Sequence, residues 1–176
     1  MESSRTKSRI KGNRCLIALT SLIILIATAC HPRAHSGESL QSGGLGLSRT
    51  EWERAHGPAA SQDSGYVNYT DEQGRFIINF MKRGAGYIKR AYSDPAGVTL
   101  DAARSESQTL IPNDYRLIRT YDTSAGPVDL YFSDSLKSIF PDDDYPARGQ
   151  LGQFIVLYFS DNGIVGSFAI GLGDNP

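Results

Sequence analysis

Apolar and polar residues alternate with two different periods along the chain, and the change of period predicts its elements. A short helix is predicted at residues 48–57, and three strands rich in aromatic and β-branched residues follow it at residues 66–69, 76–81 and 87–92. Short turns separate these strands, which predicts an antiparallel meander.

The same order occurs again in the second half. A helix is predicted at residues 99–110, and the strands after it fall at residues 116–121, 128–132, 154–159 and 164–170. These patterns predict an α+β fold of two consecutive helix-then-antiparallel-meander units, residues 45–95 and 98–173, with the helices packed on antiparallel sheet.

Local signals define the ends of several elements. Ser48 and Glu51 have the spacing of a capping box, and the helix that they begin carries the only tryptophan, Trp52, on its predicted core face. Thr99 is a suitable N-cap for the second helix. The sequence Asp161-Asn162-Gly163 predicts a tight hairpin turn between the last two strands.

The first 29 residues have the order of a secretory signal. A basic stretch precedes an apolar run at residues 16–26, and small residues follow at Ala27, Thr28 and Ala29 before Cys30. A retained membrane helix is one interpretation, but the apolar run is shorter than the roughly 20 residues that a spanning helix needs. Cleavage after Ala29 by the ordinary signal peptidase is another.

Cysteine usage favours a third interpretation, lipidation of Cys30. Cys15 would leave with the signal, so no partner would remain for a disulfide with Cys30. Residues 27–30 resemble the lipobox of bacterial lipoproteins, and the resemblance implies a thioether-linked lipid on Cys30. His31 takes the place of the Asp that marks inner-membrane retention in such proteins, which implies the outer membrane where the cell has one.

Residues 30–44 are rich in Ser and Gly and are predicted to form a flexible tether, because they hold too little apolar surface to fold. One globular domain is predicted at residues 45–173. A short helix with a Trp, a Gly-Pro stop and a three-stranded meander behind a lipobox is similar to the small outer-membrane-assembly lipoproteins. Doubled, this order is similar to the tandem-repeat inhibitor proteins that bind β-lactamase. Both resemblances imply action by binding other proteins.

Charge and motifs exclude several functions. From Cys30 onward there are 13 basic and 18 acidic residues, a net charge of −5, which argues against a nucleic-acid partner and against purely electrostatic attachment to anionic lipid. His31 and His35 lie in the predicted tether, and His56 lies at the end of the first helix, where a capping role is expected. No nucleophile elbow, zinc-protease motif or phosphate loop is present, and no cofactor is predicted.

The densest acidic cluster is Asp142, Asp143 and Asp144, with Asp134 upstream. Oxygen ligands of this kind could hold calcium, but the spacing is not that of an EF-hand, so an exposed acidic loop is the main interpretation and a calcium site the alternative. The cluster lies within residues 133–149, which interrupt the second meander and include a predicted short helix at residues 134–140. We expect this segment to contact a partner, with Asp142, Asp143, Asp144 and Tyr145 at its centre.

Four basic residues, Lys82, Arg83, Lys89 and Arg90, fall on the predicted hairpin at residues 80–92. One interpretation is a patch for anionic lipid or a cell-wall polymer. The other is a solvated hairpin whose charges prevent edge-to-edge aggregation.

Together these features predict a lipid-anchored extracytoplasmic protein of the bacterial envelope that acts as a non-enzymatic protein-binding or assembly module. Its expected partners are the membrane, through the lipid, and another envelope protein. One alternative is a hydrolase or cell-wall-active enzyme that uses Asp114 or Asp129 with the Asp142 cluster. The other is an inhibitor or a sensor of a soluble ligand.

Overall fold

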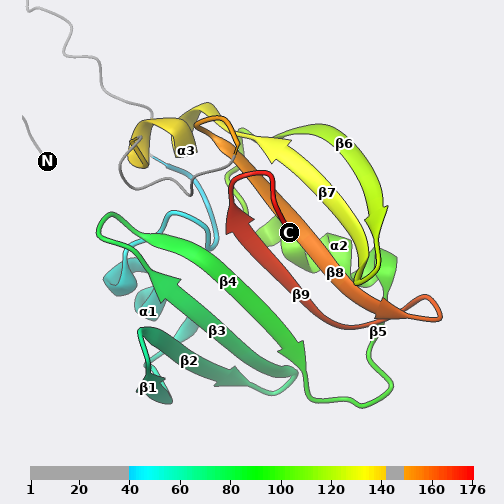
Figure 1. Ribbon diagram of the computed structural model, residues 1–176. Coiled ribbons are helices and arrows are strands. Elements are labelled where there is room, and N and C mark those ends of the chain that lie inside the picture. The colour runs from blue at the N-terminus through cyan, green and yellow to red at the C-terminus, as the bar shows by residue number, and fades with distance from the viewer. Residues whose placement is uncertain (1–39, 142–148) are drawn as a thin grey trace, which may run out of the picture. The chain divides into compact units, whose positions relative to one another are not determined.

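A single antiparallel sheet dominates the part of the chain that the computed structural model describes, residues 40–141 and 149–176 (Figure 1). Its order along the sheet is β1-β2-β3-β4-β9-β8-β7-β6, and the short strand β5 pairs with the end of β9. The strands are β1 (Ser61–Asp63), β2 (Tyr66–Asp71), β3 (Gly74–Phe80), β4 (Ala85–Tyr92), β5 (Val98–Thr99), β6 (Arg116–Thr123), β7 (Gly126–Phe132), β8 (Gln153–Asp161) and β9 (Ile164–Leu172). The helices are α1 (Arg49–His56), α2 (Leu100–Thr109) and α3 (Asp134–Ile139).

The predicted fold class, an α+β fold of two consecutive helix-then-meander units, is wrong. The described chain is mainly β, its helices are short, and its strands form one continuous sheet. The predicted strands are all present, but β1 and β5 were not predicted, and the pairing of β4 with β9 joins the two halves of the chain edge to edge. Periodicity reports which segments are extended and carries no information about such a long-range partner.

The helix termini follow their local signals. The Ser48 side chain accepts a hydrogen bond from the Glu51 amide, and the Glu51 carboxylate accepts one from the Ser48 amide, so the predicted capping box is confirmed. Thr99 caps α2 through the Ala102 amide. The predicted turn between β8 and β9 is confirmed as well, because Asn162 and Gly163 both adopt positive φ angles (51° and 81°).

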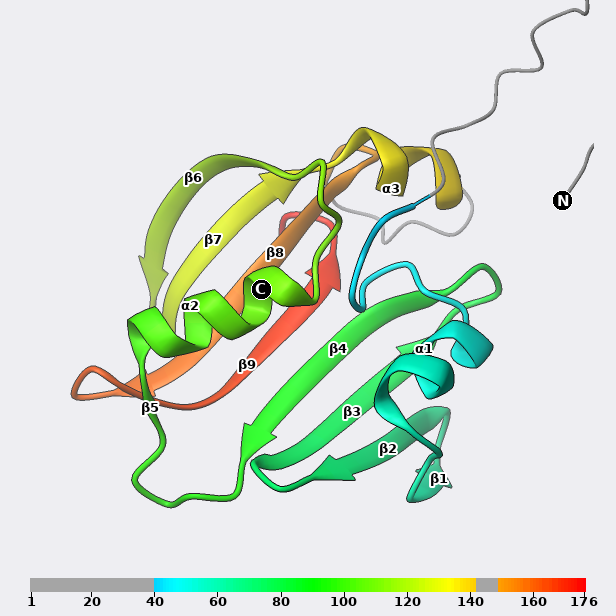
Figure 2. The same ribbon diagram turned by 180° about the vertical axis from the view of Figure 1, so that it is seen from behind.

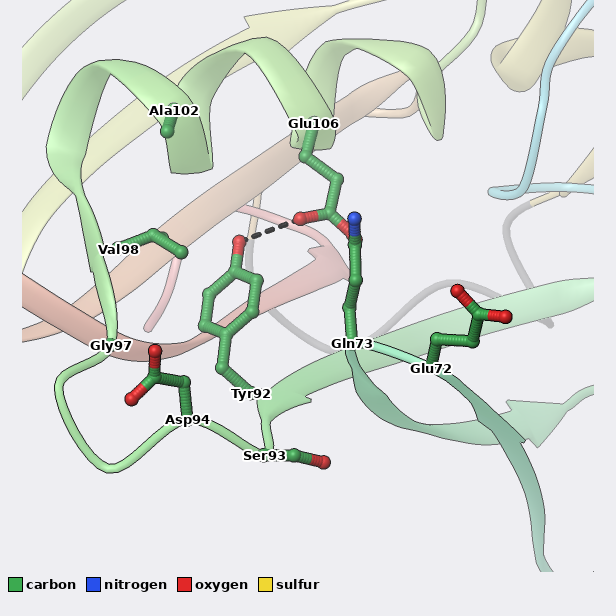
Figure 3. Close-up of a pocket in the computed structure, with 9 residues that line it drawn as sticks. All are labelled: Glu72, Gln73, Tyr92, Ser93, Asp94, Gly97, Val98, Ala102 and Glu106. Carbon is green, nitrogen blue, oxygen red and sulfur yellow. Dashed lines mark hydrogen bonds between the residues drawn. The ribbon is translucent and has the colours of Figure 1, made fainter.

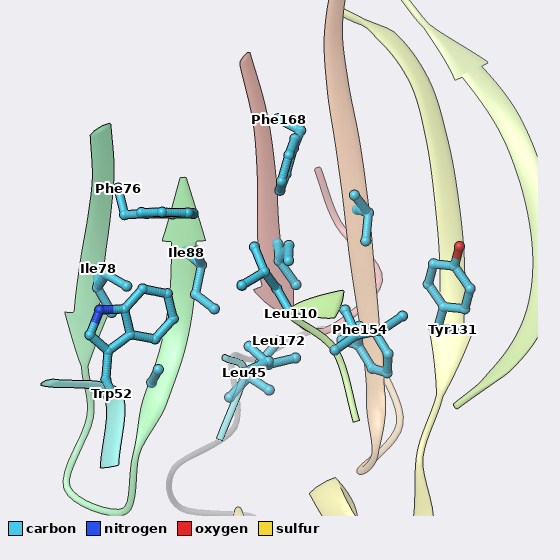
Figure 4. Close-up of a cluster of buried hydrophobic side chains, with 14 of the residues drawn as sticks. Leu45, Trp52, Phe76, Ile78, Ile88, Leu110, Tyr131, Phe154, Phe168 and Leu172 are labelled. Atoms are coloured by element: carbon cyan, nitrogen blue, oxygen red, sulfur yellow. The ribbon is translucent and has the colours of Figure 1, made fainter. Parts of the chain in front are cut away.

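Both longer helices lie on one face of the sheet. In the view of Figure 2, α2 crosses in front of β7, β8 and β9, while α1 lies in front of β2 and β3. The main core fills the space between these helices and the sheet, and Figure 4 shows how it extends from Trp52 of α1 to Tyr131 of β7. Phe168 on β9 and Phe154 on β8 are fully buried in its middle.

Residues before α1 connect the two halves on this side. The Leu45 amide donates to the Leu110 carbonyl (2.7 Å) and the Gly46 amide to the Ala85 carbonyl (2.8 Å). Ser42 forms a bridge with Pro112, so residues 42–44, which were assigned to the tether from their composition, pair with the end of α2. Leu45 is fully buried in the main core, and Figure 4 shows it beside Leu172.

The opposite face of the sheet carries no helix among the described residues (Figure 1). A second, smaller apolar cluster lies there, formed by Val128, Leu130, Ile155 and Leu157. Tyr121 and Phe159 pack against this cluster, and the Tyr121 hydroxyl donates to the Asp174 carbonyl (3.4 Å). We call this side of the sheet the helix-free face.

Candidate functional site

A cavity of about 580 Å³ opens on the helix side, between α2, the β2–β3 turn and the segment that joins β4 to β5 (Figure 3). Its walls mix acidic, amide and small apolar side chains. The lining residues are Glu72, Gln73, Tyr92, Ser93, Asp94, Gly97, Val98, Ala102 and Glu106.

A buried arginine links the walls of this cavity. Arg90 on β4 is fully buried, and its Nη1 donates to Asp71 (3.0 Å) and its Nη2 to Gln73 (3.3 Å). Its Nε lies 2.9 Å from Glu106 Oε1, an ion pair without the alignment of a hydrogen bond, and its guanidinium stacks 4.3 Å above the Phe76 ring. Arg90 therefore joins the β2–β3 turn to α2.

The acids around the cavity do not form a catalytic pair. Glu106 accepts the hydroxyl of Tyr92 at 2.7 Å in addition to its ion pair, and Asp94 accepts the Ala96 amide at 2.8 Å. In Figure 3, Glu72 points away from Tyr92 and Glu106. Burial and the hydrogen bond to Glu106 raise the pKa of Tyr92, so this phenol stays protonated and serves as a donor. These contacts tie α2 to β4 and to the β2–β3 turn.

Asp114 and Asp129, the two acids proposed for an enzymatic alternative, are both engaged in structural contacts. Buried Asp129 accepts two hydrogen bonds from Arg104 of α2 (3.1 and 3.3 Å) and one from Thr120 (2.7 Å). Asp114 accepts the Ser133 hydroxyl (2.7 Å) and the Ser135 amide (2.8 Å) at the start of α3. Asp129 therefore anchors a helix to the sheet, and Asp114 caps one.

His56 does not lie in a catalytic arrangement. Its ring stacks on Trp52 with 4.1 Å between centroids, and its Nε2 lies 2.9 Å from the Gly43 carbonyl oxygen. A carbonyl can only accept, so Nε2 carries the proton. His56 lies in the last turn of α1, as predicted, and its ring also contacts the segment that precedes α1.

The acidic residues proposed for partner or calcium contact, Asp142, Asp143, Asp144 and Tyr145, lie outside the described residues, as does Cys30. The predicted helix at the start of their segment is present as α3, and its Leu136 is fully buried, as is Phe140 directly after it. This first part of the segment therefore contributes to the core. Within the described ranges, no three His, Cys, Asp or Glu side chains are grouped so that they could hold a metal ion.

The helix-free face has a groove of about 470 Å³ that is mostly apolar. We call it the β9 groove. Its lining residues are Tyr66, Asn79, Met81, Gly86, Tyr87, Ile155, Leu157, Phe159, Ala169, Gly171, Leu172, Asn175 and Pro176.

The β9 groove results from small residues on a central strand. Ala169 pairs in register with Lys89 of β4 on one side and with Leu157 of β8 on the other. Gly171 likewise lies between Tyr87 and Ile155. Paired residues share a face of the sheet, so larger side chains on β4 and β8 form walls above a floor of small ones.

The basic cluster predicted on the β3–β4 hairpin is not formed as expected, because neighbouring strand residues point to opposite faces. Arg90 is buried on the helix side, whereas Lys89 belongs to the helix-free face, with its Nζ 5.1 Å from the Phe159 ring centroid. Lys82 and Arg83 are exposed at the turn. Of the four, Lys89 is the residue that borders the β9 groove.

Sequence reasoning did not find the β9 groove, although a signal for it exists. Along β9, large apolar residues at 168, 170 and 172 alternate with Ser167, Ala169 and Gly171. A strand that packs on one face only would normally have polar residues on its other face. Small residues at those positions, next to large residues on both paired strands, indicate a groove.

Comparisons with known proteins add little. No protein-family model matches the chain, and no curated protein matches it. Among solved structures, a cysteine-rich secretory protein from Staphylococcus aureus is similar with a TM-score of 0.38 and 16% sequence identity. The match covers 77% of this chain and 46% of that protein, so the chain spans less than half of its length. We draw no conclusion about function from a likeness of this size. None of the described helices is long and apolar enough to span a membrane.

We expect Glu106→Ala to lower the free energy of unfolding by about 3 kcal/mol, the lower end of the range for breaking a buried ion pair, because Asp71 still faces the Arg90 guanidinium. Urea denaturation followed by Trp52 fluorescence measures this. The exposed pair of Arg49 with Glu53 provides the control, and Arg49→Ala should lower the free energy of unfolding far less, because exposed ion pairs contribute little to stability. An equal loss of stability in the two variants would contradict the role of Arg90 in joining the β2–β3 turn to α2.

Stability should also depend on Asp114 in a defined pH range. Burial opposes its ionisation, but hydrogen bonds from Ser133 and Ser135 outweigh it and lower the pKa of Asp114 below the ordinary 3.8. A lowered folded-state pKa stabilises the fold above the unfolded-state value, and this contribution is lost as the pH falls through the folded-state pKa. Asp114→Asn should therefore be less stable than wild type near neutral pH, and the difference should shrink in acid below 3.8. A difference that is independent of pH would refute this.

Proposed function

We propose that the chain is a lipid-anchored extracytoplasmic binding module of the bacterial envelope, which acts without catalysis and binds its partner in the β9 groove. The observation that carries this proposal is the groove itself. It is an apolar, aromatic-walled depression on a sheet face that no described helix covers, and its floor and sides include residues of the paired strands β4, β9 and β8.

The chemistry of the β9 groove supports binding over catalysis. None of its lining residues is Asp, Glu, His, Cys, Ser or Lys, so among the described residues it offers no general base and no activated nucleophile. Tyr66 and Tyr87 meet edge to face at its end with 6.2 Å between ring centroids. Tyrosine is enriched at protein interfaces because it supplies a large contact area at a small entropic cost.

The anchor proposal is supported by the sequence before the domain. Residues 27–30 resemble a lipobox, and the Ser- and Gly-rich residues after Cys30 would keep the domain close to the membrane but movable. Fully extended, residues 30–40, which precede the first residue paired with the domain, would reach about 40 Å at most. A domain held in this way can meet partners in a thin layer next to the membrane surface.

Cys30→Ser should remove the lipid, because the thiol is the acceptor of the acyl-bearing group. We expect the wild-type chain to incorporate a fatty-acid analogue during growth and to fractionate with membranes, and the variant to do neither. Cys15→Ser serves as the control and should label like wild type, since Cys15 lies within the predicted signal. Equal labelling of wild type and Cys30→Ser would exclude this anchor.

Partner binding in the β9 groove can be tested in living cells by photo-crosslinking. A benzoylphenylalanine in place of Tyr66, which is 42% exposed at the end of the groove, should give a discrete crosslinked adduct with another envelope protein. The same substitution at exposed Arg54 on α1 is the matched control and should give none. Adducts of the same size and yield from both positions would show that the groove is not the binding surface.

A further inference from the structure

We infer that the β9 groove takes an extended peptide segment with apolar side chains at alternate positions and an acidic residue that reaches Lys89. This inference rests on the proposed function and specifies the ligand of the same site. Three observations carry it: the course of the groove along a strand, the apolar character of its walls, and the charge at its border.

The course of the β9 groove favours an extended chain. Part of its floor follows β9, with β4 and β8 on either side, two strand spacings or about 9.6 Å apart, and Tyr66, Asn79 and Met81 extend the lining towards β2 and β3. That width fits a single extended peptide backbone. Floor residues of the same face, such as Ala169 and Gly171, repeat about every 6.6 Å, which matches the repeat of alternate side chains in an extended ligand.

The walls favour a peptide over a glycan. Ile155, Leu157 and Met81 present aliphatic or thioether surface, whereas recognition of sugar hydroxyls requires several polar groups directed into the site. Among the described lining residues, the polar side chains are Asn79, Asn175 and the tyrosines, and Asn79 already donates to the Gly65 carbonyl (3.3 Å). Apolar peptide side chains would fill such walls and bury their surface.

The charge at the border favours an acidic residue in the ligand. Lys89 pairs in register with Ala169 of the floor, and its ammonium lies over the Phe159 ring, with no carboxylate partner among the described residues. Arg75 lies two residues from Ile77, the register partner of Lys89, and so shares its face. Asp63, on edge strand β1, pairs in register with Tyr66 and accepts the Ser64 hydroxyl (2.9 Å). A ligand carboxylate near Lys89 would complete an ion pair that no acidic residue of the described ranges forms.

The full-length chain in detergent can be tested against a displayed library of random 12-residue peptides. We expect wild type to enrich peptides in which apolar residues alternate with Asp or Glu. Gly171→Leu places a side chain on the groove floor, where a Cβ would meet only Tyr87 Cδ2 at an ordinary 3.7 Å, so this variant should fold. It should lose about tenfold or more in affinity for the enriched peptides, as occlusion of a central pocket does. If it fails to fold, Tyr87→Ala tests the same contact by removing a wall.

Variants with a reversed charge test the charge of the ligand separately from the location of the binding site. Lys89→Glu should lower the affinity for acidic peptides by about tenfold and raise the affinity for basic ones. Lys82→Glu, the same change at the turn, should alter neither affinity. Peptides that depend on the groove but carry no acidic enrichment would overturn the inference and leave the proposed function intact. Peptides that bind Gly171→Leu as well as wild type would overturn both. Groove-dependent binding of polygalacturonate, an anionic glycan, with no peptide enriched, would also overturn the inference.

Discussion

The pairing of β4 with β9 is the interaction on which the rest of the structure depends. It runs from Tyr87 opposite Gly171 to Ala91 opposite Ser167, and it turns two separate sets of strands into one sheet. Without it neither half would have a complete core, because an isolated small sheet with one short helix buries too little apolar surface to fold stably. The segment around Leu45 and the buried Arg90 reinforce the same junction from the helix side.

This junction gives the two faces of the sheet different chemistry. On the helix side the buried polar groups are largely engaged with one another: Arg90 with Asp71 and Glu106, and Asp129 with Arg104. Networks of this kind fix the relative positions of the elements that they join. On the helix-free face, by contrast, aromatic and aliphatic side chains surround the β9 groove, and no carboxylate of the described residues pairs with the Lys89 ammonium.

Sequence reasoning succeeded wherever the determining interaction is local. The capping box at Ser48, the cap at Thr99 and the turn at Asn162 each depend on residues a few positions apart, and each was predictable. The fold class was not, because β4 and β9 are far apart in sequence and no local pattern specifies their pairing. The orientation of Arg90 could have been predicted from its place next to Lys89 on a strand, since alternation puts one of the two on the core face. Predicting the β9 groove would have required both the pairing of β4 with β9 and the alternation of side chains along each strand.

The small residues on β9 are best explained by a requirement outside the fold. A glycine within a strand costs roughly 0.5–1 kcal/mol relative to alanine, and it adds no side chain to cover the sheet. At Gly171 the backbone has no positive φ and an added Cβ would meet nothing closer than 3.7 Å, so neither conformation nor crowding demands glycine. The neighbouring residues on the other face, Ile170 and Leu172, are buried and supply the strand's packing. A larger side chain at position 171 would therefore make the fold more stable. The space that Gly171 leaves open is the space that a ligand in the β9 groove would occupy.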